Sequence, residues 1–289
     1  MKMEENTHMP KESINKINLT GRIMEIESRT GVTKNGAPYL GGTVKIETSP
    51  DNIIPVSFFA TEKTKAGSDN PIYKSLQTVI TDYKTVHEHT ADEADIVEAS
   101  GVRVSENIYF PTADRMIRGF QLNGAFFNRN NSASPKNEFV VSGEIVEIIE
   151  DVKDDVPTGT LTVRLLVVSY GDKANIIDFK VEDPAGVNYI KSTFSAGMEV
   201  KVTGSVIIDE TIEEIKEEAA FGEPIVTTTR KTERKLLITS ATAPVESSIT
   251  LAERTTMLAV READIQAKKA EANKPAQTSK PKSGGDFTL

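Results

Sequence analysis

Nine basic and aromatic residues in the first half of the chain have side chains suited to binding a flexible polyanion that carries unstacked aromatic rings. Cations pair with phosphates, and aromatic rings stack on unpaired bases, so both types are needed side by side. They fall in two stretches separated by about sixty residues. The candidate binding residues are Arg22, Arg29, Lys34, Tyr39, Lys45, Tyr109, Phe110, Arg115 and Arg118. Their types predict an interface for single-stranded nucleic acid.

Other aromatic residues in the same half have a plainer explanation. Phe58, Phe59, Phe120 and Phe126 lie in apolar stretches that read as strands, where phenylalanine is usually buried. We therefore expect these four rings in the core. The same alternative applies to the aromatic residues expected in loops, Tyr39, Tyr109 and Phe110.

The second half carries the opposite charge in the matching stretches. Residues 14–130 hold 13 basic and 14 acidic side chains, whereas residues 131–246 hold 12 and 21, so most of the net charge of −9 lies there. Segments 150–155 and 210–218 are acidic and would repel phosphate. We expect this half to contact protein, self-associate or shield the first half. Its basic segments 227–231 and 234–235 could still contact DNA at one edge. The simpler interpretation is that they form a solvent-exposed hairpin.

Enzyme chemistry finds little support. The chain has no cysteine and three histidines, and no Gly-rich phosphate loop, GxSxG or HExxH motif. His87 and His89 on one face of a strand, with Asp92, Glu93 or Asp95, are a weak candidate for a metal site because the spacing is unspecific. We expect no catalytic residue, no metal and no cofactor.

The elements that position these residues occur twice. Residues 19–26, LTGRIMEI, match 141–148, VSGEIVEI, and residues 97–104, VEASGVRV, match 200–207, VKVTGSVI. Two pairs in the same order predict one small β-rich unit present in two copies. Gly21, Gly101, Gly143 and Gly204 interrupt apolar strands at what reads as the same position, where a bend would close a small barrel.

Each copy reads as five strands with a helix after the third. The expected strands are 17–27, 43–48, 53–60, 96–104 and 119–127, then 139–150, 160–169, 174–181, 198–208 and 234–239. The expected helices begin at Pro71 and Pro184, since proline suits a first helical position. A third helix would be capped by Ser248.

This pattern resembles the oligonucleotide/oligosaccharide-binding (OB) fold, a partly open Greek-key barrel that binds across strands two and three. The expected fold class is mainly β, with two tandem five-stranded barrels. The expected divisions are a first barrel at 14–128, a linker at 129–137, a second, acidic barrel at 138–244, a helix at 245–273 and a disordered tail at 274–289.

Two barrels, a polar tail and the ending Asp286-Phe287-Thr288-Leu289 are similar to single-stranded DNA-binding proteins of the bacterial or bacteriophage replication type. Bacterial members end in an acidic peptide with a terminal hydrophobic residue, which recruits replication and repair enzymes. The resemblance implies a non-enzymatic protein that coats and protects single-stranded DNA in replication or recombination. It also implies a protein-binding tip at Asp286, Phe287 and Leu289, a possible homo-oligomer, and a cytoplasmic location, that of the bacterial host if phage-encoded.

A structural or assembly protein is the alternative, for example a virion component or an adaptor that uses barrels to bind protein. OB-like barrels serve many functions, and the acidic loops of the second half suit this reading. No apolar run approaches the roughly 18–20 residues of a membrane span, so no membrane partner is expected.

Overall fold

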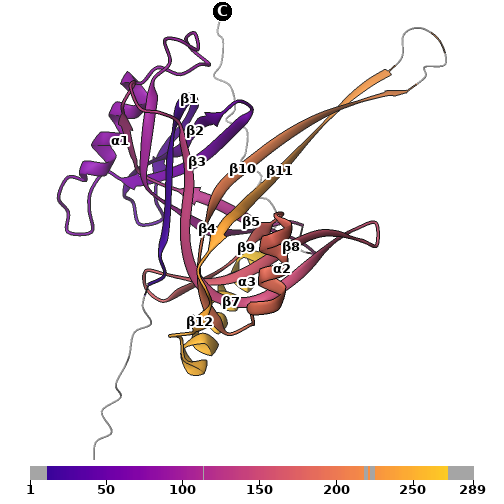
Figure 1. Cartoon of the computed structure of the whole chain (residues 1–289). Helices are drawn as coiled ribbons and strands as arrows, with labels where there is room; N and C mark the ends of the chain where they lie inside the picture. Colours follow the sequence, from indigo (N-terminus) through magenta and orange to yellow (C-terminus); the bar gives the residue numbers. More distant parts are fainter. Residues whose placement is uncertain (1–11, 113, 218–220, 222–224, 273–289) are drawn as a thin grey trace, which may run out of the picture.

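A single sheet of 12 strands, curled into two barrels, forms most of the molecule in the computed structural model (Figure 1). The structure describes residues 12–112, 114–217, 221 and 225–272. The expected fold class is confirmed: the protein is mainly β, with two barrels and a C-terminal helix. The predicted tip residues Asp286, Phe287 and Leu289 lie outside the described residues, as does all of the predicted tail at 274–289.

The first barrel closes in the order β1-β2-β3-β5-β4-β1, with β3 and β5 parallel and the other pairs antiparallel. Helix α1 fills the gap between β3 and β4, with its buried Leu76 and Val79 in the core. Pro71 is the first residue of α1, as predicted, and Asn70 caps the helix. The elements are β1 (Asn15–Val32), β2 (Pro38–Ser49), β3 (Asn52–Thr61), α1 (Pro71–Asp82), β4 (Ile96–Thr112), β5 (Arg115–Asn123) and β6 (Phe126–Arg129).

The second barrel repeats this order as β7-β8-β9-β11-β10-β7, again with a parallel pair, β9 with β11. Its hairpin β10–β11 continues beyond the barrel as a two-stranded arm (Figure 1). The elements are β7 (Lys136–Lys153), β8 (Val156–Ser169), β9 (Lys173–Val181), α2 (Pro184–Thr193), β10 (Met198–Glu217), β11 (Ile225–Ala241) and β12 (Val245–Glu246).

The four glycines do not share one structural position, contrary to the expectation. Gly21 and Gly143 do correspond: a Cβ on either would collide with a carbonyl oxygen of strand two, that of Glu47 or Leu166. Gly101, by contrast, has φ +66° and lies in a bulge of β4, where the pairing with β1 shifts by one residue. Because of this extra residue, the counterpart of Gly204 is Val102 and not Gly101.

The fifth strand of the first barrel begins earlier than expected and is interrupted. A single strand at 119–127 was expected, but β5 ends at Asn123 and β6 begins at Phe126. Between them, the Gly124 amide donates to the Ser57 carbonyl at 2.9 Å, and its Cα lies against Val102, where a Cβ would come within 2.9 Å of the Val102 side chain. The break lets β5 pair with β3 and β6 pair with β4.

Strands β1 and β7 join the barrels by antiparallel pairing. Asn15 pairs with Val141, and Leu19 pairs with Asn137. With Gly21 aligned on Gly143, Asn137 is the counterpart of Asn15 and Val141 that of Leu19. The two barrels are therefore related by a local pseudo-twofold axis between Ile17 and Phe139, as in an isologous dimer.

Reciprocal asparagine contacts extend this symmetry. The buried Asn52 side chain in β3 donates to the Val206 carbonyl and accepts from the Ile208 amide of β10, both at 3.0 Å. Its counterpart Asn175 in β9 accepts from the Glu106 amide of β4 at 3.1 Å. Each barrel thus holds the fourth strand of the other through the same position.

Helix α3 (Leu251–Ala272) contacts both barrels. Thr250 caps it, since its hydroxyl and Glu253 form a reciprocal capping box. The prediction of Ser248 as cap is wrong, because that hydroxyl donates to Glu199. Within the described residues, no helix is long and apolar enough to cross a membrane.

Replacing Asn52 by Ala tests the inter-barrel contact. The change leaves a buried carbonyl and a buried amide of β10 unpaired, so the free energy of unfolding should fall by about 1–3 kcal/mol in urea titrations. Asn35→Ala, in the exposed β1–β2 turn, is the control and should change it by less than about 0.5 kcal/mol. Equal effects of the two variants would contradict the role given to Asn52.

Candidate nucleic-acid interface

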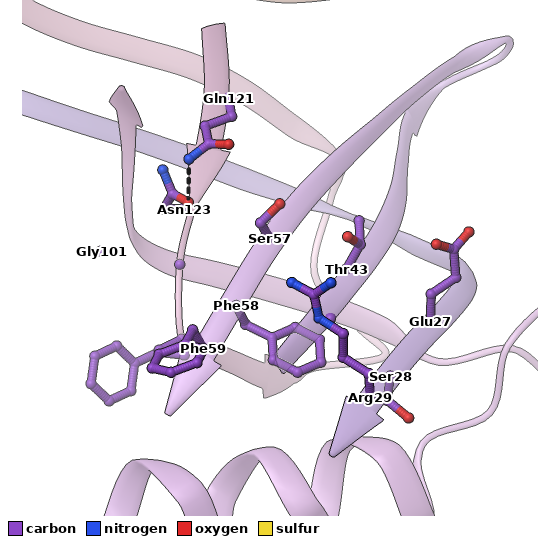
Figure 2. A pocket seen from close by; sticks show the side chains of 14 residues that line it. Glu27, Ser28, Arg29, Thr43, Ser57, Phe58, Phe59, Gly101, Gln121 and Asn123 are labelled. Atoms are coloured by element: carbon purple, nitrogen blue, oxygen red, sulfur yellow. Dashed lines mark hydrogen bonds between the residues drawn. The ribbon is translucent and has the colours of Figure 1, made fainter. Parts of the chain in front are cut away.

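A cavity of about 750 Å³ lies on the outer face of the first barrel, across β1, β2, β3 and β5. Figure 2 looks into it and shows side chains from these strands around one space. Strand alternation puts the polar members of each strand on this outer face. The lining residues are Glu27, Ser28, Arg29, Gly42, Thr43, Ser57, Phe58, Phe59, Gly101, Gln121, Asn123, Gly124, Ala125 and Phe126.

Two exposed phenylalanine rings border this cavity. Phe59 is 57% exposed and Phe126 is 48% exposed, so the expectation that both belong to the core is wrong. Phe58 and Phe127 are the buried members of each adjacent pair, because successive strand residues point to opposite faces. Phe120, as expected, is buried. Rings left in solvent beside a cavity are available to stack on a ligand.

Tyr39 extends this aromatic surface. Its ring centroid lies 5.1 Å from that of Phe59, with the planes inclined by 31°. Its hydroxyl side lies over Gly31, where a Cβ would come within 2.9 Å of the ring. Tyr39 was expected in a loop; instead it lies in β2, where it pairs with Gly31 of β1 and Thr61 of β3.

Arg29 supplies an available positive charge at the same place. It is exposed on β1 and has no ion-pair or hydrogen-bond partner among the described residues. The carboxylate in the lining, Glu27, lies 2.6 Å from the Lys45 ammonium, which also pairs with Glu25 at 2.7 Å. Hydrogen bonds to these two carboxylates raise the pKa of Lys45. The other lining residues are neutral, so Arg29 is the one cation among the described residues that line the cavity.

The other predicted residues do not line the cavity. Lys34 lies in the β1–β2 turn, 3.8 Å from Glu271, and Arg22 lies 3.6 Å from Glu47. Tyr109, Phe110 and Arg115 lie at the end of the β4–β5 hairpin, where Tyr109 is 50% exposed. The prediction missed Phe59 and Phe126, since a Phe-Phe pair does not reveal which ring faces out.

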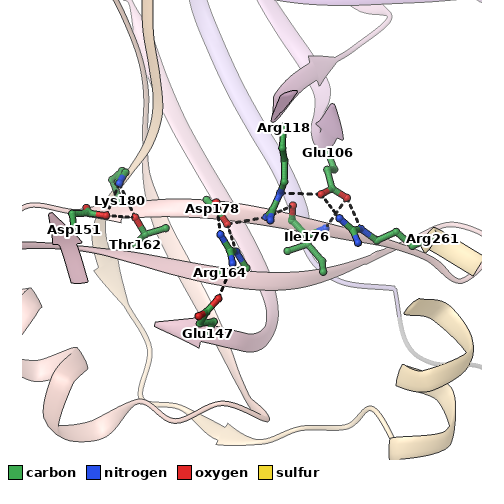
Figure 3. Close-up of polar contacts among 10 residues, drawn as sticks. All are labelled: Glu106, Arg118, Glu147, Asp151, Thr162, Arg164, Ile176, Asp178, Lys180 and Arg261. Atoms are coloured by element: carbon green, nitrogen blue, oxygen red, sulfur yellow. Dashed lines mark hydrogen bonds and ion pairs between the residues drawn. The ribbon is translucent and has the colours of Figure 1, made fainter. Parts of the chain in front are cut away.

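The Arg118 side chain forms part of the contact between the two barrels. Its guanidinium lies 3.0 Å from Glu106, and it donates to Asp178 at 2.9 Å and to the Ile176 carbonyl at 3.0 Å. Figure 3 shows the chain of ion pairs that continues through Arg164 to Glu147 and through Glu106 to Arg261. These partners leave Arg118 little capacity for a phosphate.

The matching face of the second barrel has the opposite chemistry. Asp151 stands where Arg29 stands in the first barrel, and Lys180 replaces Ser57. Lys180 donates to the Asp151 carboxylate at 2.8 Å, and Thr162 donates to the same carboxylate at 2.7 Å (Figure 3). The Thr160 hydroxyl also donates to Asp151, at 2.9 Å. Burial alone would raise the pKa of the Asp151 carboxyl, but these hydrogen bonds outweigh it and lower the pKa below its ordinary 3.8.

Helix α3 covers the rest of that face. Met257 is buried against Leu166, Val168 and Ile176, which point outward from β8 and β9. Arg254 holds the buried Glu144 of the second barrel at 2.7 Å, and Arg261, two turns later, holds Glu106 of the first barrel at 2.6 Å. Helix α3 and the paired charges of Asp151 and Lys180 therefore occupy the part of the β8–β9 face that corresponds to the cavity of the first barrel and its surroundings.

The described residues contain no cluster of three histidine, aspartate or glutamate side chains that could hold a metal ion. His87 lies on a different cavity, beside Glu25 and Lys45.

Comparison with known proteins identifies a family and gives distant structural likenesses. Residues 13–276 match the sequence model of the YorF family, whose description gives the name YorF and no function. No curated protein matches the chain. Among solved structures, the wild-type single-stranded DNA-binding protein from Thermus aquaticus is 9% identical, with a TM-score of 0.49 over 83% of this chain and 97% of that one. A replication protein A heterotrimer bound to single-stranded DNA is 10% identical, with a TM-score of 0.22 over 88% and 70%.

The closed face of the second barrel gives a pH-dependent prediction. Asp151→Asn should lower the free energy of unfolding at about pH 7, where the carboxylate attracts Lys180. Because the folded-state pKa lies below 3.8, this contribution is complete above that value and is lost as the pH falls through the folded-state pKa. Urea titrations should show the variant closer to wild type at about pH 3.

Asp154→Asn, in the exposed turn of the same hairpin, is the matched control and should show little effect at either pH. A deficit for Asp151→Asn that is the same at both pH values would contradict the ionic role of Asp151.

Proposed function

The chain belongs to the YorF family, and we propose that it binds single-stranded DNA across the outer face of the first barrel. The observation that carries the proposal is one cavity that combines exposed Phe59 and Phe126 with the unpaired Arg29. Bases stack on the rings while the guanidinium pairs with a phosphate. Stacking needs free base faces, so a duplex cannot bind in this way.

The contrast between the barrels supports this proposal. The two faces have the same strand order, yet Arg29, Ser57 and Phe59 are replaced by Asp151, Lys180 and Glu182. In the second barrel these charges are internally paired and α3 covers the adjacent surface. The first barrel, residues 14–128, is thus the main binder, and the second barrel has an accessory role.

Four of the other predicted residues take peripheral roles in the proposal. Lys34 beyond the cavity, and Tyr109, Phe110 and Arg115 on the β4–β5 hairpin, would contact DNA that extends past the cavity. Stacking and phosphate contacts are tolerant of base sequence. A protein that binds in this way would coat and protect single strands during replication or recombination, and the tip at 286–289 would recruit protein partners.

Removing the exposed rings tests the stacking. Phe59→Ala and Phe126→Ala should each weaken binding of fluorescein-labelled oligo-dT by about 5- to 150-fold in anisotropy titrations, since a stacked base contributes roughly 1–3 kcal/mol. Tyr170→Ala removes a ring that is 84% exposed on the second barrel and should leave affinity unchanged. Failure of the wild-type protein to bind at low salt would refute the function, and equal affinity of the phenylalanine variants would refute the site.

Removing the positive charge tests the phosphate contact. Arg29→Gln should weaken oligo-dT binding and reduce the slope of log affinity against log salt concentration by about 0.7, as expected for one phosphate on a single strand. Lys153→Gln, at the exposed end of β7 in the second barrel, makes the same charge change away from the cavity and should leave the slope unaltered. A slope unchanged in Arg29→Gln would show that this side chain does not meet a phosphate.

A further inference from the structure

A second cavity, of about 480 Å³, lies next along the same outer face of β2 and β3. Lys45 and Pro55 line it, each two residues along its strand from Thr43 and Ser57 of the first cavity. Residues two apart on a strand share a face, so the two cavities are neighbours on one surface. The opposite wall comes from the second barrel, through Ile208 of β10 and Arg234 of β11.

Arg234 is an unusual cation in this wall. Its guanidinium lies 5.4 Å from the centroid of the Phe120 ring, and no carboxylate among the described residues pairs with it. Partial burial of the guanidinium lowers its pKa. Two carboxylates share the lining of this cavity, Glu210 and Glu25, and Glu25 pairs with Lys45 at 2.7 Å. Arg234 is exposed to solvent, so an anionic ligand in the cavity can reach its charge. The neighbouring Lys235, by contrast, pairs with Glu182 at 2.6 Å.

The pseudo-twofold relation between the barrels shows that this second cavity is not suited to a helix such as α3. On the second barrel, the corresponding groove is filled by α3, which rests on Leu166 and is anchored by Arg261 to Glu106. The counterparts in the first barrel are Glu47 for Leu166 and Ile208 for Glu106. A helix like α3 would find neither its apolar floor nor its ionic anchor here.

We propose that the single strand bound by the first barrel continues into this second cavity and places a phosphate on Arg234. The groove would then run along β2 and β3, from the Phe59 ring to the base of the β10–β11 arm. This inference rests on the proposed function and assigns the second barrel a direct part in it. Longer strands would engage both cavities, whereas short ones would fill only the first.

The test compares Arg234→Gln with wild type on two lengths of labelled oligo-dT, about 4 and about 16 nucleotides. The variant should bind the longer oligonucleotide about 10-fold more weakly than the wild-type protein does, and the slope of its log affinity against log salt concentration should be lower by about 0.7. The shorter oligonucleotide should bind the variant and the wild-type protein equally well. Lys191→Gln, on α2 of the second barrel, is the charge-matched control and should change neither affinity.

Thr232→Glu provides a second variant, since Thr232 is exposed and lines the same cavity. The added carboxylate should repel the longer oligonucleotide without disturbing the shorter one. Wild-type affinity of both variants for the longer oligonucleotide would overturn the inference, and so would an equal loss for both lengths. The shorter oligonucleotide reports on the first cavity alone. If the wild-type protein binds it while Arg234→Gln leaves the longer one unaffected, this inference fails and the proposed function stands. If the wild-type protein binds neither length, the proposed function itself fails.

Discussion

The antiparallel pairing of β1 with β7 is the contact on which the arrangement of the molecule depends. Asn15 to Thr20 pair with Val141 to Lys136, so two barrels share one continuous sheet. Since the pairing is centred on equivalent residues, Ile17 and Phe139, each barrel meets the other through the same surface. The third strand of each then holds the fourth strand of its neighbour through Asn52 or Asn175. The sequence thus encodes within one chain the geometry of a symmetric dimer.

Within this symmetric frame, a few substitutions make the two outer faces different. Arg29 and Ser57 of the first barrel correspond to Asp151 and Lys180, which neutralise one another at 2.8 Å. Helix α3 follows only the second barrel and places Met257 over its outward residues. Its two arginines, Arg254 and Arg261, hold a buried glutamate in each barrel, so the helix also fixes the barrels to one another. A duplicated scaffold therefore keeps one open face.

Local signals in the sequence predicted the fold well and the site in part. Strand order and helix starts followed from the repeated phrases and from Pro71 and Pro184, because turn and cap chemistry act over a few residues. Arg29 and Tyr39 were anticipated from their types. Phe59 and Phe126 were not, since two adjacent phenylalanines leave the phase of strand alternation undetermined. The Gly101 bulge and the cover by α3 depend on contacts between segments far apart in the chain, which spacing alone does not encode.

One signal in the sequence was available but unused. Asn15 and Asn137 each lie six residues before the matching glycine, and the side chain of each forms hydrogen bonds with the fourth strand of its own barrel.

The central claim is that the first barrel carries the open binding face and the second does not. Photocrosslinking of a 5-iododeoxyuridine oligonucleotide to the full chain, followed by mass-spectrometric mapping, tests it directly. We expect adducts at Phe59, Phe126 or Tyr39, and none on the β8–β9 face around Asp151 and Lys180. Adducts concentrated on that face, or spread equally over both barrels, would contradict it.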